Sequence, residues 1–303
     1  MDSVLTLIAP PQASILDAAT AARARAAMDV LGAETGQAVW LSANEACDIA
    51  FSGLAVEQAE AAVRETLNEI PNTPGIDIIS QSLDGRRKKL LIADMDSTIV
   101  TGETLDELAA FAGLKERISA ITKRAMNGEI GFAEALFERV GMLSGLEEKC
   151  LEETLKAMAV SPGAQALVRT MRAHGAYTAL ISGGFTYFTE RISATVGFHE
   201  HLGNHLEIAG GKLTGRVIEP IVDKETKLKT LLALAGKKRI PTIETLSVGD
   251  GANDLPMLLS AGLGVAYHAK PAVAAGARHR IDHGDLTALL FAQGYARDEF
   301  TIT

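Results

Sequence analysis

Two aspartates, Asp94 and Asp96, follow directly after the short apolar run Leu90–Ala93, which predicts a buried strand. Burying a carboxylate beside apolar residues costs free energy unless a partner compensates its charge. On a strand that continued past them, the two side chains would share one face about 7 Å apart. That separation is too wide for carboxylates that share one proton, but it suits one carboxylate on each side of a phosphoryl group. The pair therefore predicts an in-line displacement at phosphorus.

A glycine pair follows a second apolar run, Tyr177–Ile181, and a helix is expected to begin at Thr186. The intervening Ser182-Gly183-Gly184 predicts a tight turn. Paired glycines let the backbone approach a ligand closely, and the start of a helix attracts anions. We expect the Ser182 hydroxyl and the Gly183 N–H to donate to a phosphate.

A third group of polar residues, Gly249–Asp254, follows the apolar run Leu246–Val248. Its two carboxylates and one amide, Asp250, Asn253 and Asp254, are hard oxygen ligands of the kind that Mg²⁺ prefers. These runs predict strands of a parallel sheet, and the carboxyl ends of such strands meet at one edge. The three motifs therefore predict a single magnesium-dependent phosphoryl site.

A basic residue that neutralises the phosphate is expected at the start of a helix that follows Asp223. Lys224, Lys227 and Lys229 all fit this role, and the residues alone do not separate them.

Residues 1–82 predict a small α+β domain of the ferredoxin-like type, and residues 83–89 a polar linker. Within the linker, the basic run Arg86–Lys89 is expected to be solvated. The expected elements are strand Val4–Ala9, helix Ile15–Leu31, strands Ala38–Leu41 and Cys47–Phe51, helix Glu57–Ile70 and strand Ile76–Gln81.

Residues 90–303 predict an α/β domain with a doubly wound parallel sheet, because short apolar strand runs alternate with helices. Helices alone are expected over about 104–161, as a cap inserted after the first core strand. A β-hairpin is expected over about 206–217, with Gly210 and Gly211 at its turn.

The composition of the chain argues against several kinds of binding partner and site. A net charge of −9 argues against nucleic acid, which requires clustered Lys and Arg. The two cysteines form no metal-binding or disulfide pattern, and no apolar run is long enough to span a membrane. The start of the chain does not read as a secretory signal, so we expect a cytoplasmic protein.

Taken in order, DMDST, SGG, the downstream lysine and GDGAND resemble the four motifs of the haloacid dehalogenase superfamily of phosphohydrolases, over roughly residues 89–285. The stretches DMDSTIVTGETLDELA, TKRAMNGEIGF and SVGDGANDLPML resemble the bacterial phosphoserine phosphatases more closely still. The resemblance implies that O-phospho-L-serine is hydrolysed through an aspartyl-phosphate.

The resemblance also assigns catalytic and metal-binding roles. It makes Asp94 the nucleophile and Asp96 the general acid and then base. It assigns Mg²⁺ to Asp94, to the backbone carbonyl of Asp96 and to Asp250. Asp254 would support the metal through water, and Thr98 is also given a supporting role.

Substrate-binding roles follow from the same resemblance. Glu103 and Arg139 would bind the ammonium and carboxylate of serine, and Met126 and Phe132 would close over it from the cap. Phosphate would be held by Ser182, Gly183, Lys227 and Asn253.

The N-terminal domain resembles the ACT-like regulatory domains of such enzymes. It has Ala9-Pro10-Pro11-Gln12 where those domains commonly carry a glycine, so a homodimer interface or a vestigial domain is at least as good a reading as effector binding. Three alternatives stay open: a phosphatase of the same superfamily for another small phosphomonoester, a phosphate-storing signalling receiver, and an amino-acid-sensing module.

Overall fold

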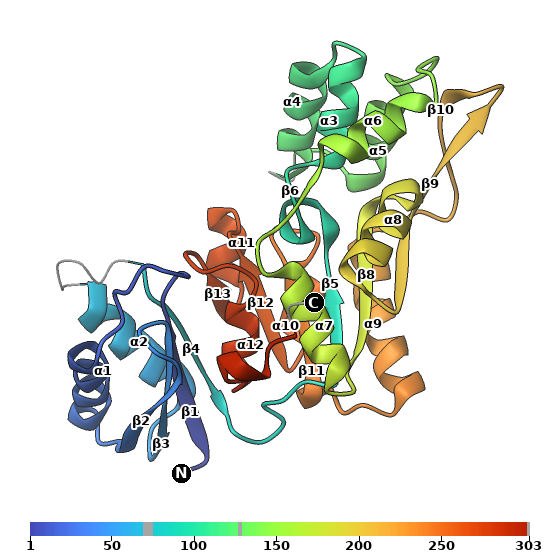
Figure 1. The fold of residues 1–303 in the computed structure, drawn as a ribbon. Helices are drawn as coiled ribbons and strands as arrows, with labels where there is room; N and C mark the ends of the chain where they lie inside the picture. Colours follow the sequence, from blue (N-terminus) through green and yellow to red (C-terminus); the bar gives the residue numbers. More distant parts are fainter. Residues whose placement is uncertain (69–74, 127–128, 302–303) are drawn as a thin grey trace.

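A computed structural model describes residues 1–68, 75–126 and 129–301, and for Met126 it describes the backbone only. The N-terminal part holds an antiparallel four-stranded sheet in the order β2-β3-β1-β4, with helices α1 and α2 packed on one face (Figure 1). The predicted order of elements is confirmed, and the sheet is compatible with an ACT-like domain. The end of the second predicted helix, at Ile70, lies outside the described residues. The bounds are β1 Ser3–Ile8, α1 Ala18–Val30, β2 Glu34–Ser42, β3 Ala46–Ser52, α2 Val56–Asn68 and β4 Asp77–Ser82.

The rest of the chain contains a seven-stranded sheet in the order β10-β9-β8-β5-β11-β12-β13, parallel except for the terminal strand β10. The predicted doubly wound α/β class is confirmed. The strands are β5 Leu90–Ala93, β8 Tyr177–Phe185, β9 Glu200–Ala209, β10 Lys212–Ile218, β11 Thr245–Gly249, β12 Leu263–Tyr267 and β13 His279–Ile281.

Alternate residues of the central strands enter two separate apolar cores, as expected where helices cover both faces of a parallel sheet. Leu91 and Ala93 pack with helices α7, α8 and α12, whereas Leu90 and Ile92 pack with α9, α10 and α11. The helices are α7 Ala164–Ala173, α8 Thr186–Val196, α9 Lys224–Lys238, α10 Leu255–Ser260, α11 Pro271–Gly276 and α12 Ala288–Ala292.

The predicted cap lies above the carboxyl ends of the strands and contains helices α3 to α6 (Figure 1). The expectation of helices alone over 104–161 is wrong in one detail. A two-residue strand, β7 Ala159–Val160, pairs with β6 Val100–Thr101 where the chain enters and leaves the cap. Strands this short have no periodicity that a sequence could reveal. The cap helices are α3 Thr104–Phe111, α4 Lys115–Met126, α5 Phe132–Gly141 and α6 Lys149–Ala157.

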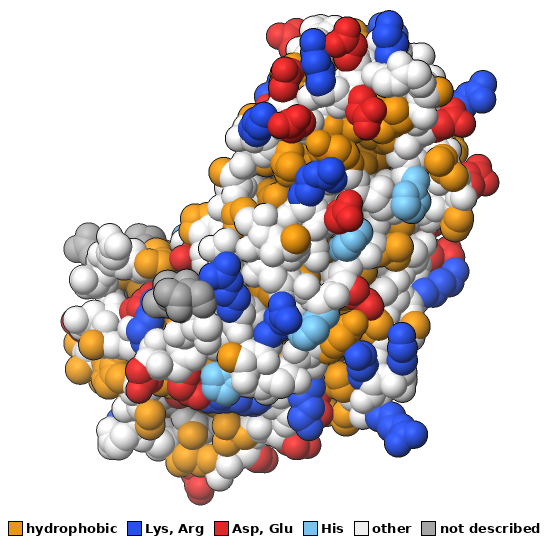
Figure 2. Space-filling view, turned by 45° about the vertical axis from the view of Figure 1, so that its right-hand side comes forward, with side chains coloured by type: hydrophobic (Ala, Val, Ile, Leu, Met, Phe, Trp, Pro, Cys, Tyr) orange, Lys and Arg blue, Asp and Glu red, His pale blue; other side chains and the backbone are white. Residues whose placement is uncertain are grey.

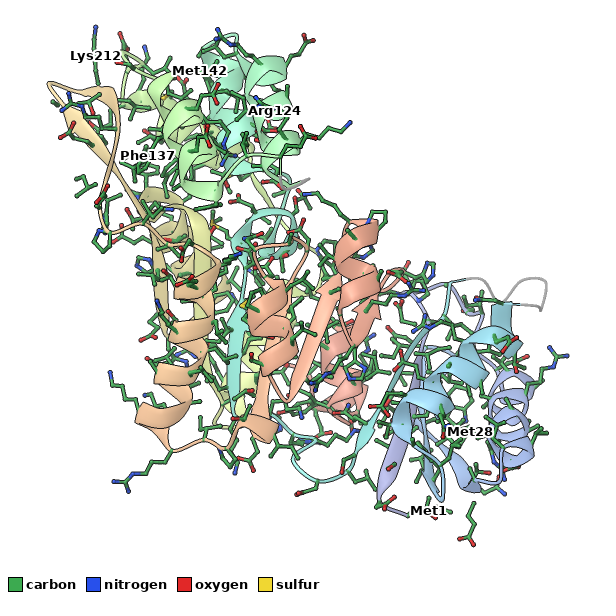
Figure 3. The ribbon with its side chains drawn as sticks, turned by 180° about the vertical axis from the view of Figure 1, so that it is seen from behind. Met1, Met28, Arg124, Phe137, Met142 and Lys212 are labelled. Atoms are coloured by element: carbon green, nitrogen blue, oxygen red, sulfur yellow. The ribbon has the colours of Figure 1, made fainter. Side chains whose placement is uncertain are left out.

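The predicted β-hairpin is confirmed and is longer than expected, comprising β9 and β10. Its turn residues Gly210 and Gly211 have φ values of 58° and 72°, which glycine adopts at low cost. The tip is hydrogen-bonded to the cap, because the Gly145 N–H donates to Leu213 O at 2.8 Å. Lys212 of the hairpin and Met142 of the cap accordingly lie at the same end of the molecule (Figure 3).

The basic run ahead of β5 is not the solvated segment that we expected. Arg86 reaches back to Asp48 of β3 at 2.7 Å, and Lys88 is buried. Only Arg87 and Lys89 of this run are exposed. The sequence pattern could not show this, because the partners of Arg86 and Lys88 come from distant parts of the chain.

Acidic and basic side chains are interspersed on the face seen in Figure 2, where hydrophobic side chains gather beneath the charged end of the cap. Within the described residues, no helix combines the length and apolar character needed to cross a bilayer.

Candidate active site

Strand β5 ends at Ala93, so the assumption that a strand carries both aspartates is wrong. The chain turns at Met95–Ile99, where Ser97 has a left-handed φ of 53°. Asp94 lies at the strand end and its carboxylate accepts a hydrogen bond from the Met95 N–H at 2.7 Å. The turn directs Asp94 and Asp96 to different sets of partners. The two carboxylates are therefore separated by this turn and not by the alternation of side chains along a strand.

Asp94 faces the lysine of α9. Lys227 Nζ lies 2.7 Å from Asp94 Oδ1 and 2.6 Å from Asp254 Oδ1, and all three side chains are buried. Asp223 caps α9 by accepting from the Thr226 N–H, and this fixes the first turn that carries Lys227. The tertiary structure thus separates the three candidate lysines, since Lys229 is exposed and pairs with Glu225, and Lys224 lines the cavity described below.

Three buried carboxylates, those of Asp94, Asp250 and Asp254, have oxygens within 4.8 Å of one another. Burial, and then the charge of Asp254, raise the pKa of Asp94 well above its usual value and that of Asp250 to about 6. Lys227 offsets one of these charges, and Lys270 Nζ lies 3.6 Å from Asp250. Clustered carboxylates with excess negative charge fit a hard divalent cation such as Mg²⁺. The expected metal set placed Asp254 behind a water, and in the structure its carboxylate has an oxygen within 4.8 Å of those of Asp94 and Asp250.

Asp96 is held by residues of both the cap and the core. Its Oδ1 accepts hydrogen bonds from the N–H and the hydroxyl of Thr104, the first residue of α3. The Ser182 hydroxyl donates to its Oδ2 at 3.4 Å. Burial raises the pKa of Asp96, which favours the protonated form that a general acid requires.

The Ser-Gly-Gly segment differs from the tight turn that we expected. Strand β8 continues through it to Phe185, but its pairing with β9 shifts register between Ile181 and Phe185, and α8 begins at Thr186 as predicted. Close contacts leave little space for side chains at the two glycines. A Cβ on Gly184 would lie 2.9 Å from Asp96 Oδ2, and one on Gly183 would lie 3.0 Å from the Phe132 ring.

Two predicted substrate-binding residues come from the cap or its edge. The Ser97 hydroxyl donates to Glu103 at 3.0 Å, and burial, then the charge of Asp96, raise the pKa of Glu103 to about 7. Arg139 is buried and donates to the Thr122 hydroxyl at 2.9 Å and to Ala135 O. Within the described residues Arg139 forms no ion pair with a carboxylate, so its charge is available to a ligand.

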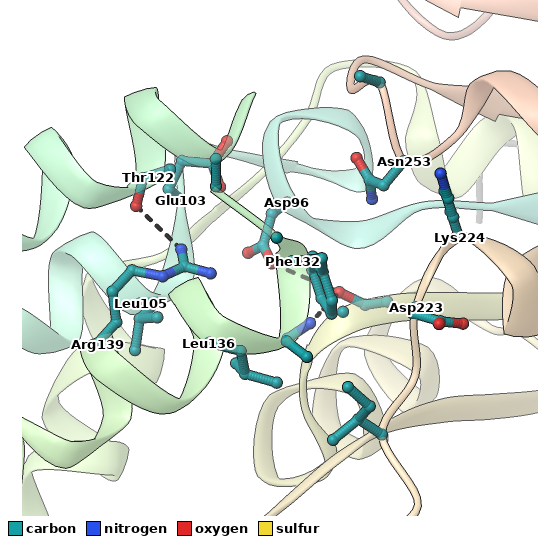
Figure 4. A pocket seen from close by; sticks show the side chains of 18 of the residues that line it. Asp96, Glu103, Leu105, Thr122, Phe132, Leu136, Arg139, Asp223, Lys224 and Asn253 are labelled. Atoms are coloured by element: carbon teal, nitrogen blue, oxygen red, sulfur yellow. Dashed lines mark hydrogen bonds between the residues drawn. The ribbon is translucent and has the colours of Figure 1, made fainter. Parts of the chain in front are cut away.

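These side chains surround one cavity of about 710 Å³ between cap and core. Arg139 and Glu103 lie on its cap side, and Asn253 and Lys224 lie on its core side (Figure 4). Of the predicted residues, the cavity is lined by Asp94, Asp96, Glu103, Phe132, Arg139, Ser182, Gly183, Asp250 and Asn253.

Three predicted residues with described side chains do not line the cavity. Lys227 and Asp254 lie beneath it, in contact with Asp94 or with each other. Thr98 is buried, and its hydroxyl has no hydrogen-bond partner in the described parts of the chain. The side chain of Met126 lies outside the described residues.

The sequence did not point to several residues that shape this site. Thr104 holds Asp96, Thr122 holds Arg139, and Lys270 lies beside Asp250. Thr104 stands just before an apolar helical pattern, which is a weak signal for a helix start. Thr122 and Lys270 carry no such signal, because only the packing of distant elements brings them here.

The model of the haloacid dehalogenase-like hydrolases matches residues 91–259. A phosphoserine phosphatase from Archaeoglobus fulgidus is 44% identical over 69% of this chain and 62% of its own length. This chain thus matches less than two thirds of that relative.

Two solved structures extend the comparison. A HAD family hydrolase from Salmonella enterica has a TM-score of 0.80 and 30% identity, over 98% of this chain and 99% of that one. A structure described as a phospho-aspartyl intermediate analogue of phosphoserine phosphatase has a TM-score of 0.65 and 36% identity, over 68% of this chain and 98% of that one. The chain therefore belongs to the family of haloacid dehalogenase-like hydrolases.

Proposed function

We propose that this protein is a phosphatase that hydrolyses O-phospho-L-serine to L-serine through a phosphorylated Asp94. The observation that carries the proposal is the buried cluster of Asp94, Lys227, Asp250 and Asp254 beneath a cavity whose opposite wall carries Arg139. The name of the archaeal relative and the phospho-aspartyl description of the solved structure support both the reaction and its intermediate.

Mg²⁺ would be held by Asp94 and Asp250, with Asp254 beside them, and when bound it would reduce the repulsion between a phosphate dianion and these carboxylates. The ammonium of Lys227 adds to that neutralisation. Ser182, Gly183 and Asn253 line the cavity, and in this proposal they would donate hydrogen bonds to phosphate oxygens.

In the first half-reaction an Asp94 oxygen forms a bond to phosphorus while the bond from phosphorus to the serine oxygen breaks. Asp96 gives its proton to that leaving oxygen. In the second half-reaction water gives a proton to Asp96 while its oxygen forms a bond to phosphorus. The bond between phosphorus and the Asp94 oxygen breaks, so orthophosphate leaves, Asp94 is again a carboxylate and Asp96 is again protonated. Proton transfer from a positioned side chain contributes roughly 10²–10⁴-fold in rate.

The cap supplies recognition of the amino acid. Arg139 can bind a carboxylate through two hydrogen bonds, and the Glu103 carboxylate can pair with an ammonium. The Phe132 ring covers the Gly183 backbone, so it would exclude water from the phosphate. The direct hydrogen bond from Thr104 to Asp96 joins the start of the cap to the reacting group.

We further propose residues 1–82 as an ACT-like domain, 83–89 as its connection and 90–303 as the catalytic domain, in a cytoplasmic enzyme. The N-terminal domain would join two copies through the edge strand β2, on which Val39 and Trp40 are exposed. Light scattering of the chain and of a Trp40→Lys variant tests this proposal, since a monomeric parent chain would refute it.

Phosphate release from L-phosphoserine, measured with Mg²⁺ and again with excess EDTA, tests the main proposal. We expect turnover that EDTA abolishes and added Mg²⁺ restores. Parallel assays with small sugar phosphates test the nearest alternative. If one of these substrates has a higher kcat/KM than L-phosphoserine, the substrate assignment is wrong.

A further inference from the structure

The irregular pairing between β8 and β9 leaves the Ser-Gly-Gly segment without its normal ladder. Ile181 pairs with Leu202 and Phe185 with Asn204, so four steps along β8 match two steps along β9. A bulge of this kind disrupts the ladder locally and redirects the bulged residues. Ser182, Gly183 and Gly184, which lie within this bulge, all line the cavity. Ser182 and Gly183 are the two that we expected to bind phosphate.

The side chain of Asn204 compensates for this interruption. It is fully buried, and its Nδ2 donates to Gly183 O at 2.7 Å. Its Oδ1 accepts from the Val222 N–H, also at 2.7 Å. One amide therefore satisfies two backbone groups that belong to no common strand or helix.

Of the two residues that Asn204 joins, one lines the cavity and the other stands between two residues that line it. Gly183 lines the cavity, and so do Ile221 and Asp223, on either side of Val222. Asp223 is the N-cap of α9, whose first turn carries Lys227. Asn204 thus connects the glycine segment of the cavity to the start of the lysine helix, although it does not line the cavity itself.

We propose that Asn204 is a positioning residue for phosphate binding: it fixes the Gly183 peptide and the start of α9 at the separation that a phosphoryl group requires. The inference deepens the proposed function and rests on it. Asn204 touches no reacting atom, so it acts only through Gly183 and the segment that leads to Lys227. A displacement of about 1 Å in such groups can cost 10²-fold in rate.

The first test replaces Asn204 with leucine, of similar size, and compares it with Gln293→Leu. Gln293 is an equally buried amide that donates to Leu289 O at 2.8 Å and accepts from the Lys88 N–H, away from the cavity. Calorimetry with orthophosphate and Mg²⁺, steady-state kinetics with L-phosphoserine, and thermal unfolding are measured on all three proteins.

Both variants should unfold at a lower temperature, since each leaves buried backbone groups unpaired. Only Asn204→Leu should weaken phosphate binding, by at least about tenfold, and lower kcat/KM by about 10²-fold. If a folded Asn204→Leu variant binds phosphate and turns over as Gln293→Leu does, the positioning role is refuted. If the parent chain binds phosphate but does not hydrolyse phosphoserine, the proposed function fails, and Asn204 is still judged by calorimetry. If the parent chain does not bind phosphate, both proposals fail.

A second variant covers the case in which leucine prevents folding. In Asn204→Asp, an ionised carboxylate can accept from the Val222 N–H but cannot donate to Gly183 O, whereas a protonated carboxyl can do both. Its kcat/KM relative to the parent chain should therefore recover as the pH falls, by about tenfold, which corresponds to one buried hydrogen bond. Dividing by the parent value at each pH removes the contributions of groups that both proteins share, which include His205, Asp223 and the catalytic residues. A ratio that stays flat while the variant remains folded would refute the role.

Discussion

Two buried charged clusters in this molecule differ in how completely their charges are compensated. Arg86, between the N-terminal sheet and α12, donates to both oxygens of Asp48 at 2.7 Å and to the Thr6 hydroxyl at 3.0 Å. It also donates to the carbonyls of Ala292 and Phe291. One cation thus faces one carboxylate, and its remaining donors are satisfied by neutral oxygens.

The cluster beneath the cavity is not balanced in this way. Asp94, Asp250 and Asp254 lie together with one buried lysine, and burial and mutual repulsion raise the pKa of the first two. A balanced cluster leaves no uncompensated charge for a ligand, and the fold loses stability when one partner is removed. An excess of negative charge that the fold holds in place can instead be compensated when a cation and a substrate bind.

The two buried lysines repeat this contrast. Lys88 donates to Gly85 O at 2.7 Å and Ile243 O at 2.8 Å, and burial lowers its pKa to about 8. Burial alone would also lower the pKa of Lys227, but the facing carboxylates of Asp254 and Asp94 raise it. The same residue type therefore supports the fold in one place and supplies fixed charge to the site in the other.

The substitution Asp94→Asn is the strongest test of the difference between the balanced and the unbalanced cluster. We expect phosphate release to fall by at least about 10⁴-fold, because an amide cannot act as the nucleophile. The unfolding temperature should not fall, since the substitution removes one of several repelling charges. Kinetics and thermal unfolding of the purified variant test both expectations. Near-normal turnover would refute the nucleophile assignment, and a large loss of stability would refute the view that the cluster is unbalanced.

Arg86→Ala should lower the stability of the protein and leave its activity unchanged, which is the opposite of the result expected for Asp94→Asn. Asp48 would be left buried without its partner, so the free energy of unfolding should fall by about 3–5 kcal/mol. Where the variant is folded, KM for phosphoserine should be unchanged. The matched control is Arg87→Ala, whose exposed pairing with Glu299 is worth less than about 1 kcal/mol. Equal losses of stability in the two variants, measured by urea unfolding, would contradict the distinction.

Arg139→Ala tests whether the cap also holds an uncompensated charge, here a positive one, that is available to a substrate. We expect kcat/KM to fall by about 10²-fold with phosphoserine, as for loss of a charge-assisted pair, and much less with p-nitrophenyl phosphate, which has no carboxylate. Arg124→Ala, an exposed cap residue, should leave the ratio of the two substrates unchanged. An equal loss on both substrates would show that Arg139 does not read the carboxylate.

The smallest expected effect is the pH dependence caused by Lys88. Its folded pKa of about 8 lies below the ordinary 10.5, so between these values the unfolded chain binds more protons than the folded one. Lys88 should therefore contribute a rise of about 2 kcal/mol to the free energy of unfolding between pH 8 and 10, measured as the difference between the parent chain and a variant without this lysine. Lys88→Met should lose this rise and the exposed Lys89→Met should keep it. Identical profiles, from urea unfolding at each pH, would contradict the assignment.

Much of this protein could be predicted locally. The order of elements around β1 to β4, the parallel core and the hairpin at Gly210 follow from short-range periodicity and turn residues. The motifs at Asp94, Ser182 and Asp250 could also be placed, because parallel strands present their carboxyl ends at one edge of a sheet. These inferences needed only the residue types and their spacing along the chain.

Other features depended on contacts between distant segments. Residue types and spacing left three lysines equivalent, and the family resemblance selected Lys227. The physical reason for that choice is the capped start of α9, which faces Lys227 toward Asp94 at the end of β5. The sequence also predicted a solvated Arg86. Its carboxylate partner Asp48 lies earlier in the sequence and its carbonyl partner Ala292 lies much later. A side chain's type is fixed by the sequence, but its charge balance is set by which groups surround it. Tertiary packing therefore decided which of these charges hold the fold together and which remain available to a ligand.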